Sequence, residues 1–178
     1  MADGWIPEFP RGTQMKRNFS FSFGVFVLAL ALFVPVIHGI SQTVVLQLRG
    51  GDRITGYPVN LLEPGSALPQ NYDALWLSQF LDCFSEGQIR VVLDKCRRSL
   101  QPEGRLFILE PLWDRQSFAA AAYSLQCTSL YFTALANGNS RMYDSRVLLA
   151  LVRDAGFEIT EQLDGLGNIQ TLLVCRPV

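Results

Sequence analysis

Two short apolar runs, at residues 74–77 and 106–109, stand out along the chain. The first follows Tyr72-Asp73, and the second follows Pro102-Glu103-Gly104 and Arg105. Apolar runs of this length that are bounded by turn residues are typical of strands buried in a parallel sheet. The pattern therefore predicts two parallel strands in one sheet.

A helix is predicted between these strands, over residues 85–100. Apolar side chains recur there at helical spacing, Ser85 and Gln88 fit a capping box, and two arginines occupy the last turn. The sequence that follows, with Pro102 and Gly104, predicts the end of the helix. In such a strand–helix–strand unit, residues after each strand lie at the carboxyl edge of the sheet, where open α/β sheets bind ligands. The residues predicted at this edge are Ser78, Gln79, Asp82 and Glu110.

The rest of the chain predicts two further helices and a closing hairpin. Residues 114–136 keep apolar residues at helical spacing with few charges, so this helix either packs in the core or lines a pocket with Phe118, Tyr123 and Phe132. Asp144 or Ser145 can cap the next helix, which ends at Ala155-Gly156. Residues 157–161 and 171–175 predict strands around the turn Asp164-Gly165-Leu166-Gly167.

The first 41 residues differ in composition from the rest, and we treat 1–41 and 42–178 as two units. Residues 19–37 have the length of a membrane span and follow the basic sequence Met15-Lys16-Arg17. We expect residues 24–37 to form a membrane-seeking helix, because the sequence LALAL favours a helix. The competing interpretations are core-forming sequence, or a reading frame that begins part-way through a longer gene. Residues 43–48, TVVLQL, predict a strand.

Composition narrows the class of protein. A chain of 178 residues with 49% hydrophobic content can bury one ordinary core. The formal net charge of −1 argues against nucleic-acid binding. The four cysteines form no CxxC pair and His38 is the single histidine, so no metal site is expected. We interpret Cys83, Cys96, Cys127 and Cys175 as buried free thiols in a reducing compartment.

The order of five short motifs resembles a known family. These are Tyr-Asp-Ala at 72–74, Phe-Leu-Asp-Cys-Phe-Ser-Glu at 80–86, the turn and strand ending at Glu110, Asn-Gly-x-x-Arg at 137–141, and Ala-Gly-Phe at 155–157. Residues 53–178 are similar to the carboxyl-terminal part of S-adenosylmethionine-dependent O-methyltransferases of the plant caffeate and bacterial polyketide type. The resemblance implies an α/β, Rossmann-like methyltransferase sheet that is incomplete at its amino-terminal side. It also implies S-adenosylmethionine as cofactor and a small, aromatic hydroxyl acceptor. The expected location is the cytoplasm, with membrane contact through residues 19–37 if they form a span, and a homodimer is a further expectation.

The resemblance also assigns catalytic positions. Asp82 stands where the relatives have a histidine that removes the acceptor proton, and Glu110 matches the first acid that supports this histidine. Ser140 stands in the place of the second acid. An aspartate is a weak base for a phenol unless burial raises its pKa. The alternative for Asp82 is a solvated residue or a partner in helix capping.

Five cofactor-binding positions also follow from the resemblance, with departures from the family pattern. Gln47 stands where relatives carry an acid that binds the ribose, and Asn60-Leu61 resembles the sequence that lies over the adenine. Ser78, next to Gln79, occupies the place of a cofactor-contacting lysine in some relatives. The glycine-rich loop that cradles the methionine end of the cofactor is missing from the sequence before Gln42, so we expect weak cofactor binding.

Two functions from different classes remain at this point. The first is an S-adenosylmethionine-dependent O-methyltransferase, or the cofactor-binding half of one, with Glu110 and Asp82 near the acceptor. The second is a non-catalytic remnant of the fold, or an anchored interaction module that keeps the sheet but lacks the site.

Overall fold

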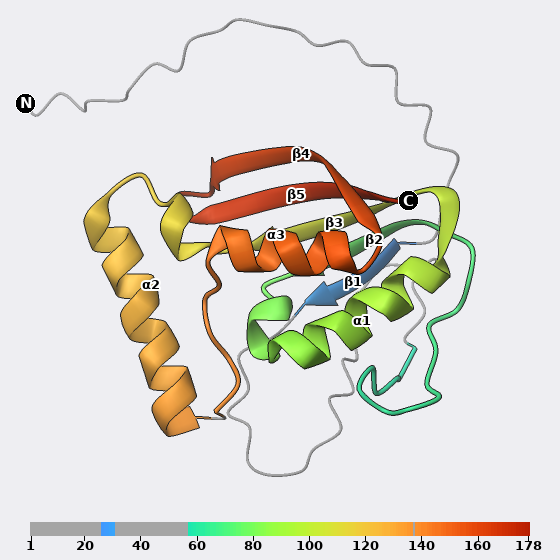
Figure 1. The fold of residues 1–178 in the computed structure, drawn as a ribbon, viewed down its shortest axis with the longest axis horizontal. Helices are drawn as coiled ribbons and strands as arrows, with labels where there is room; N and C mark the ends of the chain where they lie inside the picture. Colours follow the sequence, from blue (N-terminus) through green and yellow to red (C-terminus); the bar gives the residue numbers. More distant parts are fainter. Residues whose placement is uncertain (1–25, 31–56, 137) are drawn as a thin grey trace, which may run out of the picture.

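The computed structural model describes residues 57–136 and 138–178, together with the backbone of a strand at 26–30. Within these residues, five strands form one mixed sheet in the order β1-β2-β3-β5-β4 (Figure 1). Strands β1, β2 and β3 are parallel, β5 is antiparallel to β3, and β4 is antiparallel to β5. The strands are β1 Phe26–Leu30, β2 Tyr72–Ser78, β3 Leu100–Glu110, β4 Phe157–Leu166 and β5 Gln170–Pro177.

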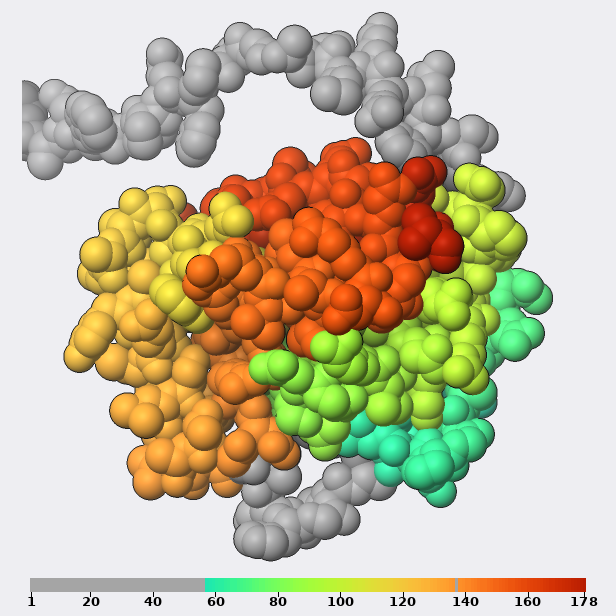
Figure 2. Space-filling model, viewed as in Figure 1, coloured from blue at the N-terminus to red at the C-terminus, as the bar shows by residue number. Residues whose placement is uncertain are grey.

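Helices α1 and α3 lie against one face of this sheet, whereas α2 lies at one end of the molecule (Figures 1 and 2). The helical elements are η1 Leu81–Cys83, α1 Glu86–Ser99, η2 Trp113–Arg115, α2 Ala119–Tyr131 with the π-helical turn η3 Phe132–Ala136, and α3 Ser145–Asp154. The arrangement confirms the predicted α/β fold and the strand–helix–strand unit.

The start of α1 shows why this segment is helical. The Ser85 hydroxyl accepts a hydrogen bond from the backbone N–H of Gln88 (3.4 Å), and the Gln88 side chain accepts one from the backbone N–H of Ser85 (2.9 Å). This is the predicted capping box, and it satisfies two amide groups that the helix leaves without an internal partner. The apolar face of α1, formed by Ile89, Val92, Leu93 and Cys96, is buried.

The core lies between the sheet and the two helices α1 and α3. Along β3, Leu106 and Ile108 are buried, whereas Phe107 between them is half-buried on the opposite face. There the Phe107 ring stacks on Trp76 of β2, with ring centroids 5.5 Å apart. This alternation follows from the two-residue period of a strand, and it shows that the helices cover the face bearing Leu106.

The amino-terminal prediction is wrong for residues 26–30. We expected residues 24–37 to form a membrane-seeking helix. Instead β1 pairs in parallel with β2, with Leu28 opposite Trp76. An unpaired ladder edge recruits another strand, and FVLAL is apolar enough to serve as one. The remaining positions of 19–37, and the strand predicted at 43–48, lie outside the described residues. In the part of the chain that the structure describes, no helix is long and apolar enough to cross a membrane.

Three boundaries also differ from the predictions. Residues 101–104, expected as a loop, belong to β3, which starts directly after α1. Gly104 makes this possible, because a Cβ there would come within 3.0 Å of the backbone oxygens of Tyr72 and Gln101. Strand β4 continues to Leu166, and the turn lies after it, where Gly167 and Asn168 have positive φ.

The predicted core role of the long helix is also wrong. It begins at Ala119, and neither α2 nor η3 contains a buried residue. Tyr123 is 70% exposed and Leu135 is 77% exposed. The helical period was read correctly, but an apolar helix is buried only where another element covers it, and none of the described elements does so here.

The described cysteines are free thiols, as predicted. Cys96 and Cys175 are buried and Cys83 is half-buried, but Cys127 on α2 is exposed. The prediction that Cys127 is buried is wrong, because Cys127 lies on α2 and none of the described elements covers that helix.

Candidate active site

Glu110, the last residue of β3, joins the carboxyl ends of β2 and β3. Its side chain is buried, and one carboxylate oxygen, Oε1, accepts hydrogen bonds from the backbone N–H groups of Phe80 (2.9 Å) and Leu81 (2.8 Å). The two bonds link a side chain of β3 to two consecutive backbone amides at the start of η1. Glu110 therefore fixes the start of η1 relative to the sheet. Its other oxygen, Oε2, is buried and has no hydrogen-bond partner.

The chain turns sharply between β2 and η1. Gln79 has a left-handed backbone conformation with φ 46°, and its N–H donates to the carbonyl of Leu109 (2.8 Å). Non-glycine residues in this conformation are uncommon and concentrate at functional sites. The turn carries the chain from the sheet edge into η1, the short helix that contains Asp82.

Asp82 has an unusual protonation equilibrium. Its side chain is half-buried, and burial raises its pKa from 3.8 to about 6. The Cys83 thiol donates a hydrogen bond to the Asp82 carboxylate across 3.5 Å. Burial and the neighbouring negative charge of Asp82 raise the pKa of Cys83 to about 12, so it remains a neutral thiol. A carboxyl group with a pKa near 6 is a better proton acceptor for a hydroxyl than an ordinary aspartate.

Glu110 is even less readily ionised. Burial raises its pKa well above 4.5, and the negative charge of Asp82 raises it further, whereas the backbone N–H groups of η1 oppose the shift. The two carboxyl groups that were assigned from the sequence are thus close enough to influence each other.

The loop before α3 packs onto η1 from the other side. The Arg141 N–H donates to the carbonyl of Asp82 (2.8 Å), and the hydroxyl of the buried Ser140 donates to the carbonyl of Cys83 (3.4 Å). The Tyr143 hydroxyl donates to the carbonyl of Phe84 (2.6 Å). The loop therefore binds three consecutive backbone carbonyl groups, those of Asp82, Cys83 and Phe84.

Arg141 and Tyr143 were not predicted as site residues. The Arg141 guanidinium forms an ion pair with Glu86 at the start of α1 (2.5 Å) and lies 4.8 Å above the Tyr143 ring. Arg141 belongs to the Asn-Gly-x-x-Arg motif, so the motif pointed to this loop. The sequence does not reveal that the backbone of Arg141 binds Asp82, because 58 residues separate them.

The structure brings some predicted residues together and separates others. Ser78 is buried at the end of β2, and Gln79, Asp82, Glu110 and Ser140 surround the same edge. Asn60 and Leu61 lie elsewhere, because their loop is bound to the second half of α1: the Lys95 ammonium donates to Ser66 Oγ (2.5 Å), which in turn donates to the Asn60 carbonyl (2.5 Å). Gln47 lies outside the described residues.

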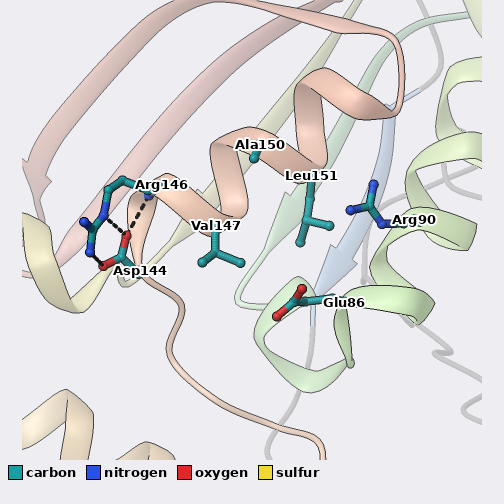
Figure 3. Close-up of a pocket in the computed structure, with 7 residues that line it drawn as sticks. All are labelled: Glu86, Arg90, Asp144, Arg146, Val147, Ala150 and Leu151. Atoms are coloured by element: carbon teal, nitrogen blue, oxygen red, sulfur yellow. Dashed lines mark hydrogen bonds and ion pairs between the residues drawn. The ribbon is translucent and has the colours of Figure 1, made fainter.

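A surface groove of about 520 Å³ lies between α1 and α3 (Figure 3). It is lined by Glu86, Arg90, Asp144, Arg146, Val147, Ala150 and Leu151. Its arginines are already paired, Arg146 with Asp144 (2.8 Å) and Arg90 with Asp154 (2.9 Å). The groove contains none of the predicted site residues, and its charges compensate one another, so we do not assign it to the site. Among the described residues, no cluster of His, Cys, Asp and Glu is arranged to hold a metal ion.

Comparison with known proteins agrees with the fold. A family model described as an O-methyltransferase domain matches residues 64–158, more than half of the chain. The chain belongs to this O-methyltransferase family. The match includes Ser78, Gln79, Asp82, Glu110 and Ser140.

The matches with individual relatives cover only part of each relative's length. A 3-amino-4-hydroxybenzoate 4-O-methyltransferase of Streptomyces cremeus is 30% identical over 131 residues, which are 72% of this chain and 34% of the relative. The crystal structure of TnmH has a TM-score of 0.62 at 23% identity and covers 71% of this chain and 35% of its own. Human N-acetylserotonin methyltransferase, solved in complex with S-adenosylmethionine, has a TM-score of 0.57 at 19% identity. This match covers 70% of this chain and 34% of the human protein. The chain thus spans about a third of the length of these relatives.

Proposed function

We propose that this chain contributes the methyl-acceptor side of an S-adenosylmethionine-dependent O-methyltransferase that acts on a hydroxyl of a small aromatic compound. The observation that carries the proposal is the pair of neighbouring carboxyl groups at the carboxyl edge of the sheet, half-buried Asp82 and buried Glu110. The family supports the reaction class, and the hydroxybenzoate relative supports an aromatic hydroxyl as acceptor.

In this proposal Asp82 receives the proton of the acceptor hydroxyl. Its raised pKa of about 6 leaves it ionised at neutral pH while bringing its basicity closer to that of a phenol. Glu110 holds η1 through the N–H groups of Phe80 and Leu81, and Ser140 and Arg141 hold it through backbone carbonyls. These contacts keep the carboxyl group in one position, which matters because methyl transfer depends mainly on proximity and alignment.

The fit of the cofactor differs between its two ends. S-adenosylmethionine, when bound, supplies the methyl group from a positively charged sulfonium. The Asp82 carboxylate suits a cation at this edge, and Ser78 and Gln79 flank it. The sequence after β1, ALFVPVIHGI, has neither the glycine-rich run nor the acid of the family pattern, and Asn60 and Leu61 lie at the far end of α1. We therefore propose that the chain alone binds the cofactor weakly.

Assembly and location are further parts of the proposal. A homodimer is supported by the surface of α2, where Phe118, Tyr123, Leu130 and Leu135 are exposed and no charged residue occurs over 116–140. The cytoplasm is supported by the need for S-adenosylmethionine. We also propose that residues 42–178 hold the methyltransferase unit, to which the 1–41 segment adds β1.

The test is an assay of the full chain with methyl-labelled S-adenosylmethionine and a set of hydroxybenzoates, including 3-amino-4-hydroxybenzoate. We expect slow formation of a labelled methyl ether that stops when Asp82 is replaced by Asn. Absence of labelled product at saturating cofactor would favour the alternative, a non-catalytic remnant that keeps the sheet and the packing of η1.

A further inference from the structure

The two carboxyl oxygens of Glu110 lie in different surroundings. Oε1 accepts two backbone hydrogen bonds, whereas Oε2 is buried without a partner. A buried polar atom without a partner loses its hydrogen bonds to water and gains none in return, so in a native protein it calls for a specific explanation. If Oε2 carries a proton, it becomes a hydrogen-bond donor, while Oε1 still accepts from the η1 backbone.

The neighbouring groups favour a proton on Glu110. The second carboxyl group is that of Asp82. Asp82 is half-buried, whereas Glu110 is only 3% exposed. Two neighbouring carboxylates in a poorly solvated site cannot both ionise without a large cost, and the more deeply buried one keeps the proton.

No described neighbour offsets this repulsion. The Cys83 thiol beside Asp82 is neutral, and Ser78 and Thr171, at the ends of the adjoining strands, carry no charge. The nearby cation is Arg141, whose guanidinium is paired with Glu86 and lies over the ring of Tyr143. Its positive charge is therefore already balanced by Glu86.

We propose that Glu110 is a neutral carboxylic acid at neutral pH and Asp82 is ionised, so that the pair supplies one base and one hydrogen-bond donor. The donor, Oε2–H, suits an acceptor molecule with an oxygen next to the hydroxyl that is methylated, such as a second hydroxyl, a carbonyl or a carboxylate. The direction of the Glu110 pKa, raised by burial, agrees with this division. The consequence for substrate choice rests on the proposed function, whereas the protonation of Glu110 does not.

The protonation states can be measured without catalysis. The full chain is labelled with 13C at the side-chain carboxyl groups of Glu and Asp, and the Glu110 signal is assigned by its loss in Glu110→Gln. Gln fits the site because its oxygen can accept from Phe80 and Leu81 and its NH2 group can donate in place of Oε2–H. We expect the Glu110 signal not to titrate between about pH 4 and 7, and Asp82 to titrate near pH 6.

The variants separate the two possibilities. If Glu110 is neutral, Glu110→Gln removes no charge, and the titration of Asp82 stays where it is in the unaltered chain. If Glu110 is ionised, its own signal titrates below about pH 5, and Glu110→Gln lowers the apparent pKa of Asp82 by removing a negative neighbour. Either of these last two results overturns the proposal.

Two controls make the result independent of folding and of catalysis. Glu158→Gln changes an exposed glutamate of β4 and is expected to leave both signals in place. If Glu110→Gln does not fold, the Glu signal that shifts in Asp82→Asn is assigned to Glu110, because Asp82 is its charged neighbour. A Glu110 signal that titrates below about pH 5 in the unaltered chain still overturns the proposal. A lack of methyl transfer would count against the proposed function alone, because the titration is read without substrate.

Discussion

Glu110 accepts a hydrogen bond from the backbone N–H of Leu81 across 2.8 Å, although 29 positions separate the two residues in the sequence. This bond fastens the helical turn that carries Asp82 to the last residue of β3. The candidate site is thus built by backbone contacts from β3 on one side and from the loop before α3 on the other. The predictions below test these contacts separately.

The first prediction concerns Asp82 as the proton acceptor. Asp82→Asn keeps the shape of the side chain but removes its basicity, so the rate of methyl transfer should fall by roughly 10²–10⁴-fold. In the unaltered chain the rate should rise with pH through about 6, as Asp82 ionises, and level off at higher pH. Rates measured across this range test both statements. Asp73→Asn, at an exposed position of β2, is the matched control and should leave the rate unchanged.

The second prediction concerns stability and pH. The pKa of Asp82 is raised from 3.8 to about 6 in the folded chain, so over this interval the folded state binds a proton that the unfolded state has lost. Stability therefore falls as pH rises through that interval, by up to about 2–3 kcal/mol from this residue. Asp82→Asn should flatten the slope in denaturant unfolding at several pH values. An equally steep slope in the variant would show that Asp82 is not the group responsible.

The third prediction concerns Arg141, which we interpret as a positioning residue. Its ion pair with Glu86 is about half exposed, so Arg141→Gln should cost less than about 1 kcal/mol of stability. The rate should fall more than this loss of stability explains, because the loop that holds Asp82 loses its anchor on α1. The pH at which the rate changes should stay near 6, since Asp82 itself is unaltered.

Arg146→Gln is the matched control for Arg141. Arg146 also pairs with an acid, but its side chain is 84% exposed and its guanidinium donates to Asp144, at the start of α3, and not to η1. A loss of rate as large in this variant as in Arg141→Gln would contradict the positioning role.

The fourth prediction concerns β1. A chain limited to residues 42–178 lacks Phe26–Leu30 and leaves one ladder edge of β2 unpaired. We expect it to aggregate or to unfold with low cooperativity, because bare strand edges associate with other chains. Removal of residues 1–17 alone keeps β1 and should be tolerated. A sharp and reversible thermal transition in the 42–178 chain would show that β2 does not need this partner.

The local elements could be predicted from the sequence because their signals are local. The Ser85–Gln88 capping box fixed the start of α1, and Gly156, with φ 80°, follows the end of α3 where Ala155-Gly156 predicted it. The positions of Asp82 and Glu110 at one edge also followed, because in a strand–helix–strand unit the carboxyl ends of neighbouring parallel strands meet.

The tertiary structure decided what depends on distant partners. Residues 26–30 have sequence features of both helix and strand, and the open ladder edge of β2 selects the strand. The exposure of α2 depends on which elements lie beside it. The spacing of apolar residues along α2 predicts a helix but does not say whether another element covers that helix. The protonation of Asp82 and Glu110 depends on burial and, for Glu110, also on the negative charge of Asp82, which comes close to it only when η1 packs against the end of β3. Sequence spacing determines which residues share an element, whereas burial and charge coupling arise only when separate elements pack together.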